Sequence, residues 1–162
     1  MLCTMLATIT AYGIGTFIHV LAVVLTFGPT FGYGIFIGVA EQNSPRSIPA
    51  VLRGIQQVDR FMVKPGLIVV LLAGIYLLTK ADIPVDETWV SVGFVAIIVL
   101  LGMAHAFFGP NVKKALGLAE RDLQGGDTLS EEYAAISRKL ATGGKIAGLI
   151  VVVAVFFMVV KP

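Results

Sequence analysis

Four long apolar stretches constrain this chain more than any other feature of its sequence. They run from about residue 11 to 39, 61 to 79, 89 to 109 and 143 to 160, and none of them contains Asp or Glu. A membrane-spanning helix needs about 20 mostly apolar residues. The 162 residues therefore predict a single membrane domain with an all-α, polytopic fold, a four-transmembrane-helix antiparallel bundle.

The composition supports a membrane protein and excludes several other classes. Hydrophobic residues make up 57% of the chain and charged residues 14%, whereas soluble domains carry about 25% charged residues. This balance excludes a disordered chain and argues against a soluble enzyme. The net charge of +2 gives no basis for a nucleic-acid partner. The single cysteine, Cys3, cannot form an intrachain disulfide.

The connections between the stretches differ in basic residues, and this difference predicts the orientation. The first and third connections, with their edges, contain Arg46, Arg53, Arg60, Lys64, Lys113, Lys114, Arg121, Arg138, Lys139 and Lys145. The second connection contains only Lys80, beside three acidic residues. The positive-inside rule places the basic connections in the cytoplasm. We therefore expect a multi-pass protein of the cell inner membrane with both termini outside the cytoplasm.

The first cytoplasmic connection has the pattern of an amphipathic helix over about residues 49–62. Apolar residues recur at helical spacing, and Arg53, Gln56, Gln57 and Arg60 take the opposite face; the apolar ones are Val51, Leu52, Ile55, Val58 and Met62. This pattern predicts an interfacial helix that leads into the second span.

The second cytoplasmic connection, residues 110–142, has the pattern of a helical hairpin. Gly125 and Gly126 break the helix that continues the third span. Thr128 and Glu131 form a capping-box pattern for a new helix that runs into the fourth span.

Small residues are expected to bring the spans together, because lipid supplies no hydrophobic force between helices. Such pairs are Gly28 and Gly32, Gly34 and Gly38, Gly102 and Ala106, and Gly144 and Gly148. We favour packing within one chain over a dimer contact. Pro29 predicts a kink in the first span. Residues 25–34 are therefore a candidate for bending around a ligand, or form a purely structural kink.

Apart from Lys145 at the edge of the fourth stretch, the Lys and His side chains within the stretches are His19, Lys64 and His105. Ionisable residues within spans are functional candidates. His19 lies about 12 Å below the outer face and His105 about 24 Å below it, so we do not expect the two histidines to share one iron or other metal ion. An outer polar group would contain His19, Tyr76, Trp89 and Ser91 and could hold a haem edge, a quinone head group or a metal. Alternatively His19 braces the bundle and the aromatic residues are interface anchors.

The inner polar group would contain Lys64 and His105. A lysine at this depth can snorkel, reaching lipid phosphates with its ammonium group while its stem stays in the apolar layer. We therefore keep a structural and a functional interpretation for both residues.

The first span, between His19 and Phe36, contains the run Leu-Thr-Phe-Gly-Pro-Thr-Phe-Gly-Tyr-Gly. Together with Pro65-Gly66, Leu72-Ala73-Gly74 and Trp89-Val90, it resembles a group of small bacterial membrane proteins. The group includes the four-helix haem-b protoporphyrinogen oxidases and the copper-resistance membrane domain. The nearest resemblance is to an uncharacterised predicted integral membrane family, the domain of unknown function twenty-two sixty-nine.

The resemblance to the oxidases implies a haem-b site with two ligands. His19 matches the first ligand. The second ligand in the oxidases is a lysine four residues after the tryptophan of the third span, and that position here is Gly93, which cannot bind iron. This departure argues against oxidase activity, although a haem held by His19 alone, or by His19 with a different second ligand, remains an alternative.

Three functions follow from these observations. The first is a small accessory or interaction protein without turnover, which joins a membrane-protein partner or a second copy of itself in the bilayer. The second is a haem- or quinone-linked redox protein that uses His19. The third is a transporter of a small solute, which the absence of carboxylates from the four stretches disfavours.

Overall fold

The computed structural model describes residues 10–162, and Cys3 lies outside the described residues. In chain order the elements are α1 (Ala11–Asn43), the short 3-10 helix η1 (Pro45–Ser47), α2 (Ile48–Val58), the π-helical segment η2 (Asp59–Val63), α3 (Lys64–Lys80), α4 (Thr88–Gly102), the π-helical segment η3 (Met103–Phe108), α5 (Gly109–Gln124) and α6 (Glu131–Val160).

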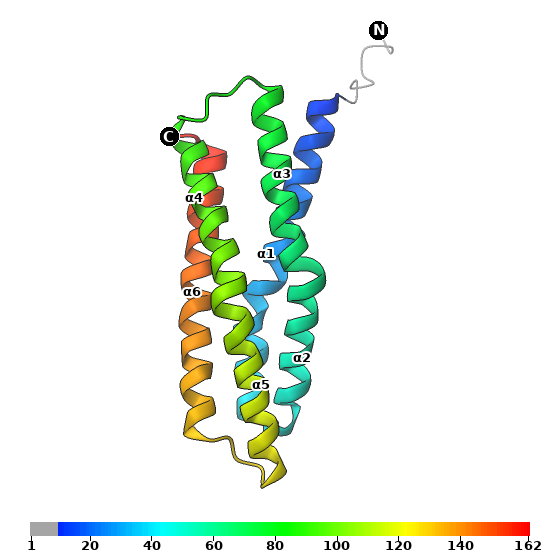
Figure 1. Ribbon diagram of the computed structural model, residues 1–162, viewed down its shortest axis with the longest axis vertical. Helices are drawn as coiled ribbons and strands as arrows, with labels where there is room; N and C mark the ends of the chain where they lie inside the picture. The colour runs from blue at the N-terminus through cyan, green and yellow to red at the C-terminus, as the bar shows by residue number, and fades with distance from the viewer. Residues whose placement is uncertain (1–9) are drawn as a thin grey trace.

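These elements join into four long helices that run side by side (Figure 1). Each is long and apolar enough to cross a membrane: Ala11–Asn43, Pro45–Lys80, Thr88–Gln124 and Glu131–Val160. The predicted all-α fold with four spans is therefore confirmed. We call the end with the α5–α6 turn the hairpin end. The opposite end, which holds Ala11 and the C-terminus, is the terminal end.

Two of the long helices widen into a π-helical segment, and a proline explains each one. Pro65 follows η2 and Pro110 follows η3 at the same distance of two residues. Proline has no N–H to donate to the carbonyl four residues earlier, which is that of Phe61 or Ala106 within the segment. The wider turn accommodates this loss without ending the helix.

The buried side chains form two separate cores. One, the hairpin core, lies in the half of the bundle near the hairpin end and contains Ala40, Ile48, Leu52, Ile55, Val112, Ala115, Leu118, Ala119, Tyr133 and Leu140. The other, the membrane core, contains Val63, Leu67, Val70, Ile97, Leu100 and Val151. Many large apolar side chains around the membrane core are exposed, as expected for a surface that faces lipid.

The prediction of an interfacial helix over residues 49–62 needs correction. The helix exists as α2, but its apolar face packs against protein: Ile48, Leu52 and Ile55 are all buried in the hairpin core. The apolar side chains that would have entered a bilayer surface instead contact α5 and α1. Amphipathic periodicity identifies the apolar face of a helix but not what covers that face.

The α5–α6 turn breaks the helix where the paired glycines predict, since α5 ends at Gln124. The predicted cap at Thr128 is wrong, because Ser130 is the N-cap of α6 and its hydroxyl accepts a hydrogen bond from the Tyr133 N–H. Asp122 holds this cap in place by accepting a hydrogen bond of 2.8 Å from the Ser130 N–H. Hydrogen bonds from Ser130 lower the pKa of Asp122 to about 2.

The glycines pack differently from the predicted pairs. Gly148 does lie against another helix, at the Phe31 ring of α1. A Cβ atom added at Gly28, Gly34 or Gly38, however, would meet nothing within 4 Å. The expected packing of these three glycines within one chain is therefore wrong, and so is that of Gly102 and Gly144, where an added Cβ would also meet nothing within 4 Å. Gly28 and Gly34 are exposed on α1, and Gly38 is half-buried.

Candidate functional site

The most extensive helix contact among the described residues joins α1 to α3, and we call this contact the α1–α3 seam. Small residues make this approach possible. On α1, Gly15 receives the Tyr76 ring of α3; on α3, Gly74 receives the His19 imidazole. The seam therefore holds two of the residues that the sequence singled out, His19 and Tyr76.

His19 places an ionisable side chain within the seam. The imidazole is half-buried, and its Nδ1 atom is buried without a hydrogen-bond partner. It lies beside Gly74 and near the Val70 backbone carbonyl. Glycine at position 74 leaves the backbone of α3 uncovered there. An imidazole nitrogen without a partner at membrane depth is costly, so this atom needs either the nearby Val70 carbonyl or a ligand as its partner.

Tyr76 lies toward the terminal end from His19, on the same seam. A Cβ atom at Gly15 would come within 2.7 Å of the Tyr76 ring, so only glycine fits beneath it. The Tyr76 hydroxyl donates a hydrogen bond of 3.4 Å to the Ala11 carbonyl. Tyr76 therefore covers the seam on the side of His19 that is nearer the terminal end.

Thr26 is a polar seam residue that the sequence did not single out. Its side chain is 1% exposed, and its hydroxyl is buried without a hydrogen-bond partner. It lies against Gly66 of α3, where an added Cβ would collide with the threonine hydroxyl. The signal in the sequence was a threonine at the spacing of two helical turns from His19, on the same face of α1.

A second missed contact lies where the seam meets η2. The Tyr33 hydroxyl donates a hydrogen bond of 3.2 Å to Oδ1 of Asp59. Asp59 follows Ile55 by one helical turn, so the sequence does place a carboxylate on the apolar face of the α2 pattern.

Trp89 and Ser91 contact a different part of the molecule. The Trp89 ring receives the ammonium group of Lys161 at 4.7 Å from its centroid, which ties α4 to the end of α6. The Ser91 hydroxyl donates a hydrogen bond of 3.4 Å to the Val85 carbonyl. These contacts join α4 to α6 and to the preceding turn, whereas those of His19 and Tyr76 join α1 to α3.

Gly93, the position of the second ligand in the resemblance, is also part of the α4–α6 contact. A Cβ atom at Gly93 would collide with the methyl group of Met158. The side chain from α6 therefore fills the space that a longer residue at position 93 would need.

The inner polar residues occupy separate surfaces. His105 is exposed, and its Nδ1 atom is 3.0 Å from the Leu101 carbonyl of the same helix. Lys64 is half-buried at the start of α3, close to Asp59. His105 thus satisfies one ring nitrogen within its own helix, unlike His19.

The haem-b site implied by the resemblance can be tested against these residues. The unpartnered Nδ1 of His19 fits one bond to a metal or one hydrogen bond to a cofactor. The second position does not fit, because Gly93 has no donor and Met158 fills its space. Within residues 10–162 no group of three or more His, Cys, Asp or Glu is placed to hold a metal ion. The residues therefore suit a ligand held from one side.

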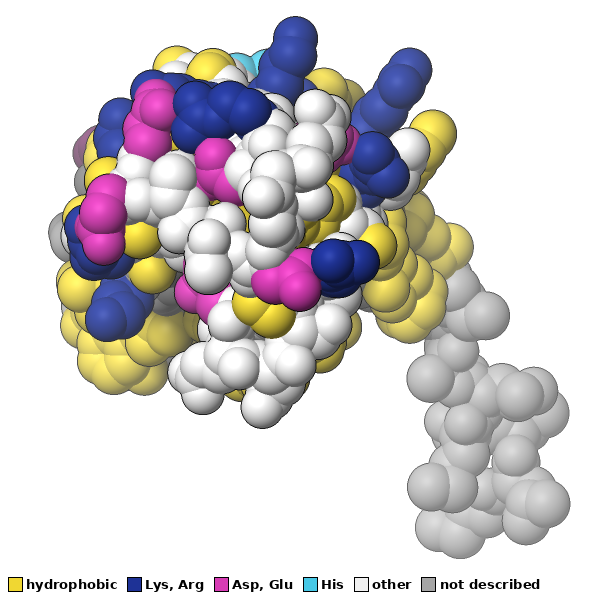
Figure 2. Space-filling model, turned by 90° about the horizontal axis from the view of Figure 1, so that it is seen from below, with side chains coloured by type: hydrophobic (Ala, Val, Ile, Leu, Met, Phe, Trp, Pro, Cys, Tyr) yellow, Lys and Arg dark blue, Asp and Glu magenta, His cyan; other side chains and the backbone are white. Residues whose placement is uncertain are grey.

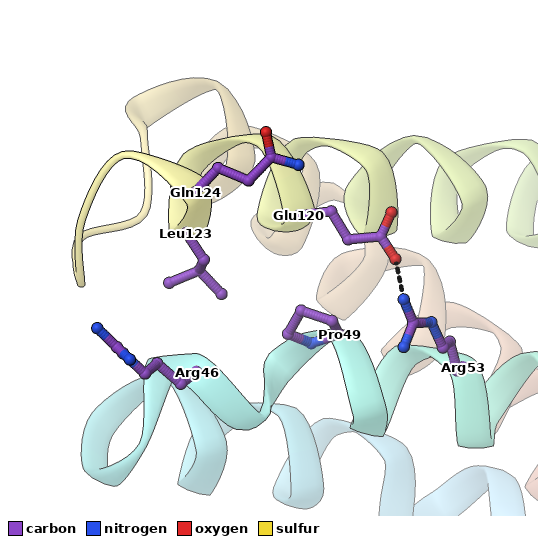
Figure 3. A pocket seen from close by; sticks show the side chains of 6 residues that line it. All are labelled: Arg46, Pro49, Arg53, Glu120, Leu123 and Gln124. Carbon is purple, nitrogen blue, oxygen red and sulfur yellow. Dashed lines mark hydrogen bonds and ion pairs between the residues drawn. The ribbon is translucent and has the colours of Figure 1, made fainter.

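Two further polar groups stabilise the hairpin end. Ser137 of α6 donates a hydrogen bond of 2.6 Å to Glu41 of α1, beside the buried Tyr133. Between α2 and α5 lies an open groove of about 480 Å³ (Figure 3). Its Arg53 forms an ion pair of 2.6 Å with Glu120, and its Arg46 pairs with Asp127. Both arginines are already paired with carboxylates. The ion pairs therefore hold this part of the bundle together, and neither arginine is left free to bind an anionic ligand.

Comparison with known proteins adds a family. The family described as "Predicted integral membrane protein (DUF2269)" matches residues 14–162. No curated protein and no solved structure matches the chain. The match covers all four long helices except the first turn of α1. The chain therefore belongs to the DUF2269 family of integral membrane proteins.

Proposed function

We propose that this membrane protein binds a redox cofactor, haem b or a quinone, at His19 in the α1–α3 seam. The observation that carries the proposal is the buried Nδ1 atom of His19, which has no hydrogen-bond partner. Bound haem would supply one-electron chemistry at its iron, and a bound quinone would supply electron and proton transfer at its ring.

The protein's own contribution would be to position the cofactor and exclude water. Gly74 lets the imidazole lie directly against α3, and Tyr76 covers the seam toward the terminal end. The lipid-facing surface around the seam is apolar, which suits a porphyrin or a prenylated quinone. The Gly93 position argues against protoporphyrinogen oxidase activity in this chain.

The two histidines provide a matched pair of variants for the test. We would purify the protein in mild detergent from cells supplied with a haem precursor and record visible spectra with and without dithionite. We expect a Soret band that His19→Ala abolishes and His105→Ala retains, because His105 is exposed and bonds its own helix. If the cofactor is a quinone instead of haem, added quinone should raise the melting temperature of the wild type and of His105→Ala only.

Two results would contradict the proposal. One is a colourless wild-type protein whose melting temperature does not change when quinone is added. The other is a spectrum or a quinone response that His19→Ala leaves unchanged while the variant remains folded by circular dichroism.

A second candidate function is that of an accessory protein without turnover, which binds a membrane-protein partner or a second copy. The specific observation in its favour is the open space at Gly34 and Gly38, which lie one turn apart on the same face of α1, because small residues allow a neighbouring helix to approach closely. Crosslinking and native mass spectrometry test it. A strictly solitary monomer in mild detergent would count against it.

We infer further that the hairpin end faces the cytoplasm of a cell with this protein in its inner membrane. The support is the concentration of Arg and Lys in the connections at that end. Under this orientation both termini lie outside the cytoplasm, and His19 lies in the outer half of the bilayer.

A further inference from the structure

A groove on the lipid-facing surface lies between η3 and α6. It measures about 510 Å³, and its lining is almost entirely apolar; the lining residues are Met103, Phe107, Lys139, Thr142, Gly143 and Ile146. It shares no residue with the α1–α3 seam, so it is independent of any cofactor at His19.

Close packing shapes the groove. A Cβ atom at Gly143 would collide with the Phe107 ring, so glycine lets this ring lie directly against the backbone of α6. Met103 and Phe107 both belong to the π-helical segment η3. The floor of the groove is therefore a fixed feature of the contact between η3 and α6.

The charged group among the lining residues is Lys139, which is exposed. Its ammonium nitrogen lies 5.4 Å from the centroid of the Phe107 ring. Among residues 10–162, no carboxylate lies within ion-pair distance of it. The Thr142 hydroxyl donates to the Arg138 carbonyl, so Lys139 is the donor left for an anion.

The charge and the apolar lining occur at different depths. From Val160 at the terminal end, Lys139 lies about 30 Å along α6, and Ile146 lies about 20 Å along it. The hydrocarbon layer of a bilayer is about 30 Å thick. Lys139 therefore lies at the headgroup level of the leaflet at the hairpin end, and the apolar lining lies at the level of acyl chains.

We propose that this groove binds one anionic phosphoglyceride, with its phosphate at Lys139 and an acyl chain along Phe107 and Ile146. Basic and acidic side chains gather around the hairpin end, and apolar side chains surround the flanks (Figure 2). Many of the basic groups there are paired with carboxylates, whereas Lys139 is free to bind a phosphate. The unpaired charge of Lys139 and its depth at the headgroup level thus both favour an anionic lipid of the leaflet at the hairpin end.

The experiment is native mass spectrometry of the purified protein titrated with phosphatidylglycerol or with phosphatidylcholine. We expect one phosphatidylglycerol molecule per chain to bind in preference to phosphatidylcholine. Lys139→Ala should weaken its apparent affinity about fivefold, the effect expected for one basic residue beside an anionic lipid. Arg138→Ala is the matched control, because it removes the same charge at the same depth of α6 from an exposed residue outside the groove.

A second variant tests the shape of the groove without changing its charge. Ile146→Trp adds bulk to an exposed lining position and should displace the acyl chain, so the affinity for phosphatidylglycerol should fall although Lys139 is present. Both variants change exposed side chains, and circular dichroism establishes that they are folded.

Three outcomes would overturn the proposal. Equal affinities for the two lipids would remove anionic selectivity. Equal losses in Lys139→Ala and Arg138→Ala would reduce the effect to general surface charge. Unchanged binding in both Lys139→Ala and Ile146→Trp would exclude this groove as the site.

Discussion

At the scale of single residues, the α1–α3 seam depends on which side chain meets each glycine. The sequence predicts His19 and Tyr76 as members of one polar group, and the structure brings both to the same pair of helices. The sequence also predicts Trp89 and Ser91 as members of that group, whereas in the structure their contacts join α4 to α6 and to the preceding turn. Depth along a helix follows from residue number, but the direction in which a side chain points across the bundle depends on how the helices pair.

Thr26 and Gly66 give a prediction at this scale. Gly66→Ala should destabilise the protein by about 1–3 kcal/mol, the usual effect of overpacking a core. The new Cβ would collide with the Thr26 hydroxyl and would also come within 3.1 Å of the Thr26 Cβ, so rotation of the hydroxyl alone does not relieve the contact. Thermal denaturation in detergent measures the change.

The double variant distinguishes this contact from a general effect of alanine. Thr26→Ala removes the colliding hydroxyl and should recover part of the stability that Gly66→Ala loses, which a double-mutant cycle would detect. Gly34→Ala is the control, since its Cβ would meet nothing within 4 Å. Additive effects of Thr26→Ala and Gly66→Ala would contradict the contact.

At the scale of elements, the sequence predicts where helices lie better than what covers them. The apolar runs located the four spans, and Gly125 and Gly126 located the α5–α6 turn. The covering of α2 was not predictable from periodicity, because a bilayer surface and a protein core both select apolar side chains. The N-cap at Ser130 depends on its hydrogen bond to Asp122, a partner outside the local capping pattern.

Leu52 and Leu72 test the difference between the two kinds of surface. Leu52 of α2 is 1% exposed in the hairpin core, and Leu72 of α3 is 60% exposed on the lipid-facing surface. Leu52→Ala should lower the free energy of unfolding by about 2–5 kcal/mol through the lost burial and the cavity. Leu72→Ala should change it by less than about 0.5 kcal/mol.

The measurement is the denaturation midpoint of each variant in the same detergent, with circular dichroism as the signal for unfolding. A small effect of Leu52→Ala would mean that the apolar face of α2 does not pack against protein, and the interfacial helix expected from the sequence would then be the better description.

At the scale of the whole molecule, the two described ends of the chain lie at the same end of the bundle. An even number of spans predicts this from the sequence alone. Which end faces the cytoplasm follows from loop charges and not from packing, so the orientation needs a measurement in cells.

Reporter fusions provide that measurement. An alkaline phosphatase fusion, which is active only outside the cytoplasm, should be active at either terminus. A fluorescent reporter that requires the cytoplasm should be silent at the same positions and active when inserted at the α5–α6 turn. A cytoplasmic signal from either terminus would reverse the orientation, and with it the leaflet assigned to His19.

The division into two cores means that the two halves of the same helices are stabilised in different ways, one by water and one by packing within lipid. Water drives the assembly of the hairpin core, because burying its apolar side chains removes them from water. Lipid tails are as apolar as the side chains around the membrane core, so that half depends on close packing instead. Urea should therefore loosen the molecule first from the hairpin end, and a harsh detergent first from the terminal half. Conditions chosen to solubilise the protein thus decide which half of the same four helices is lost first.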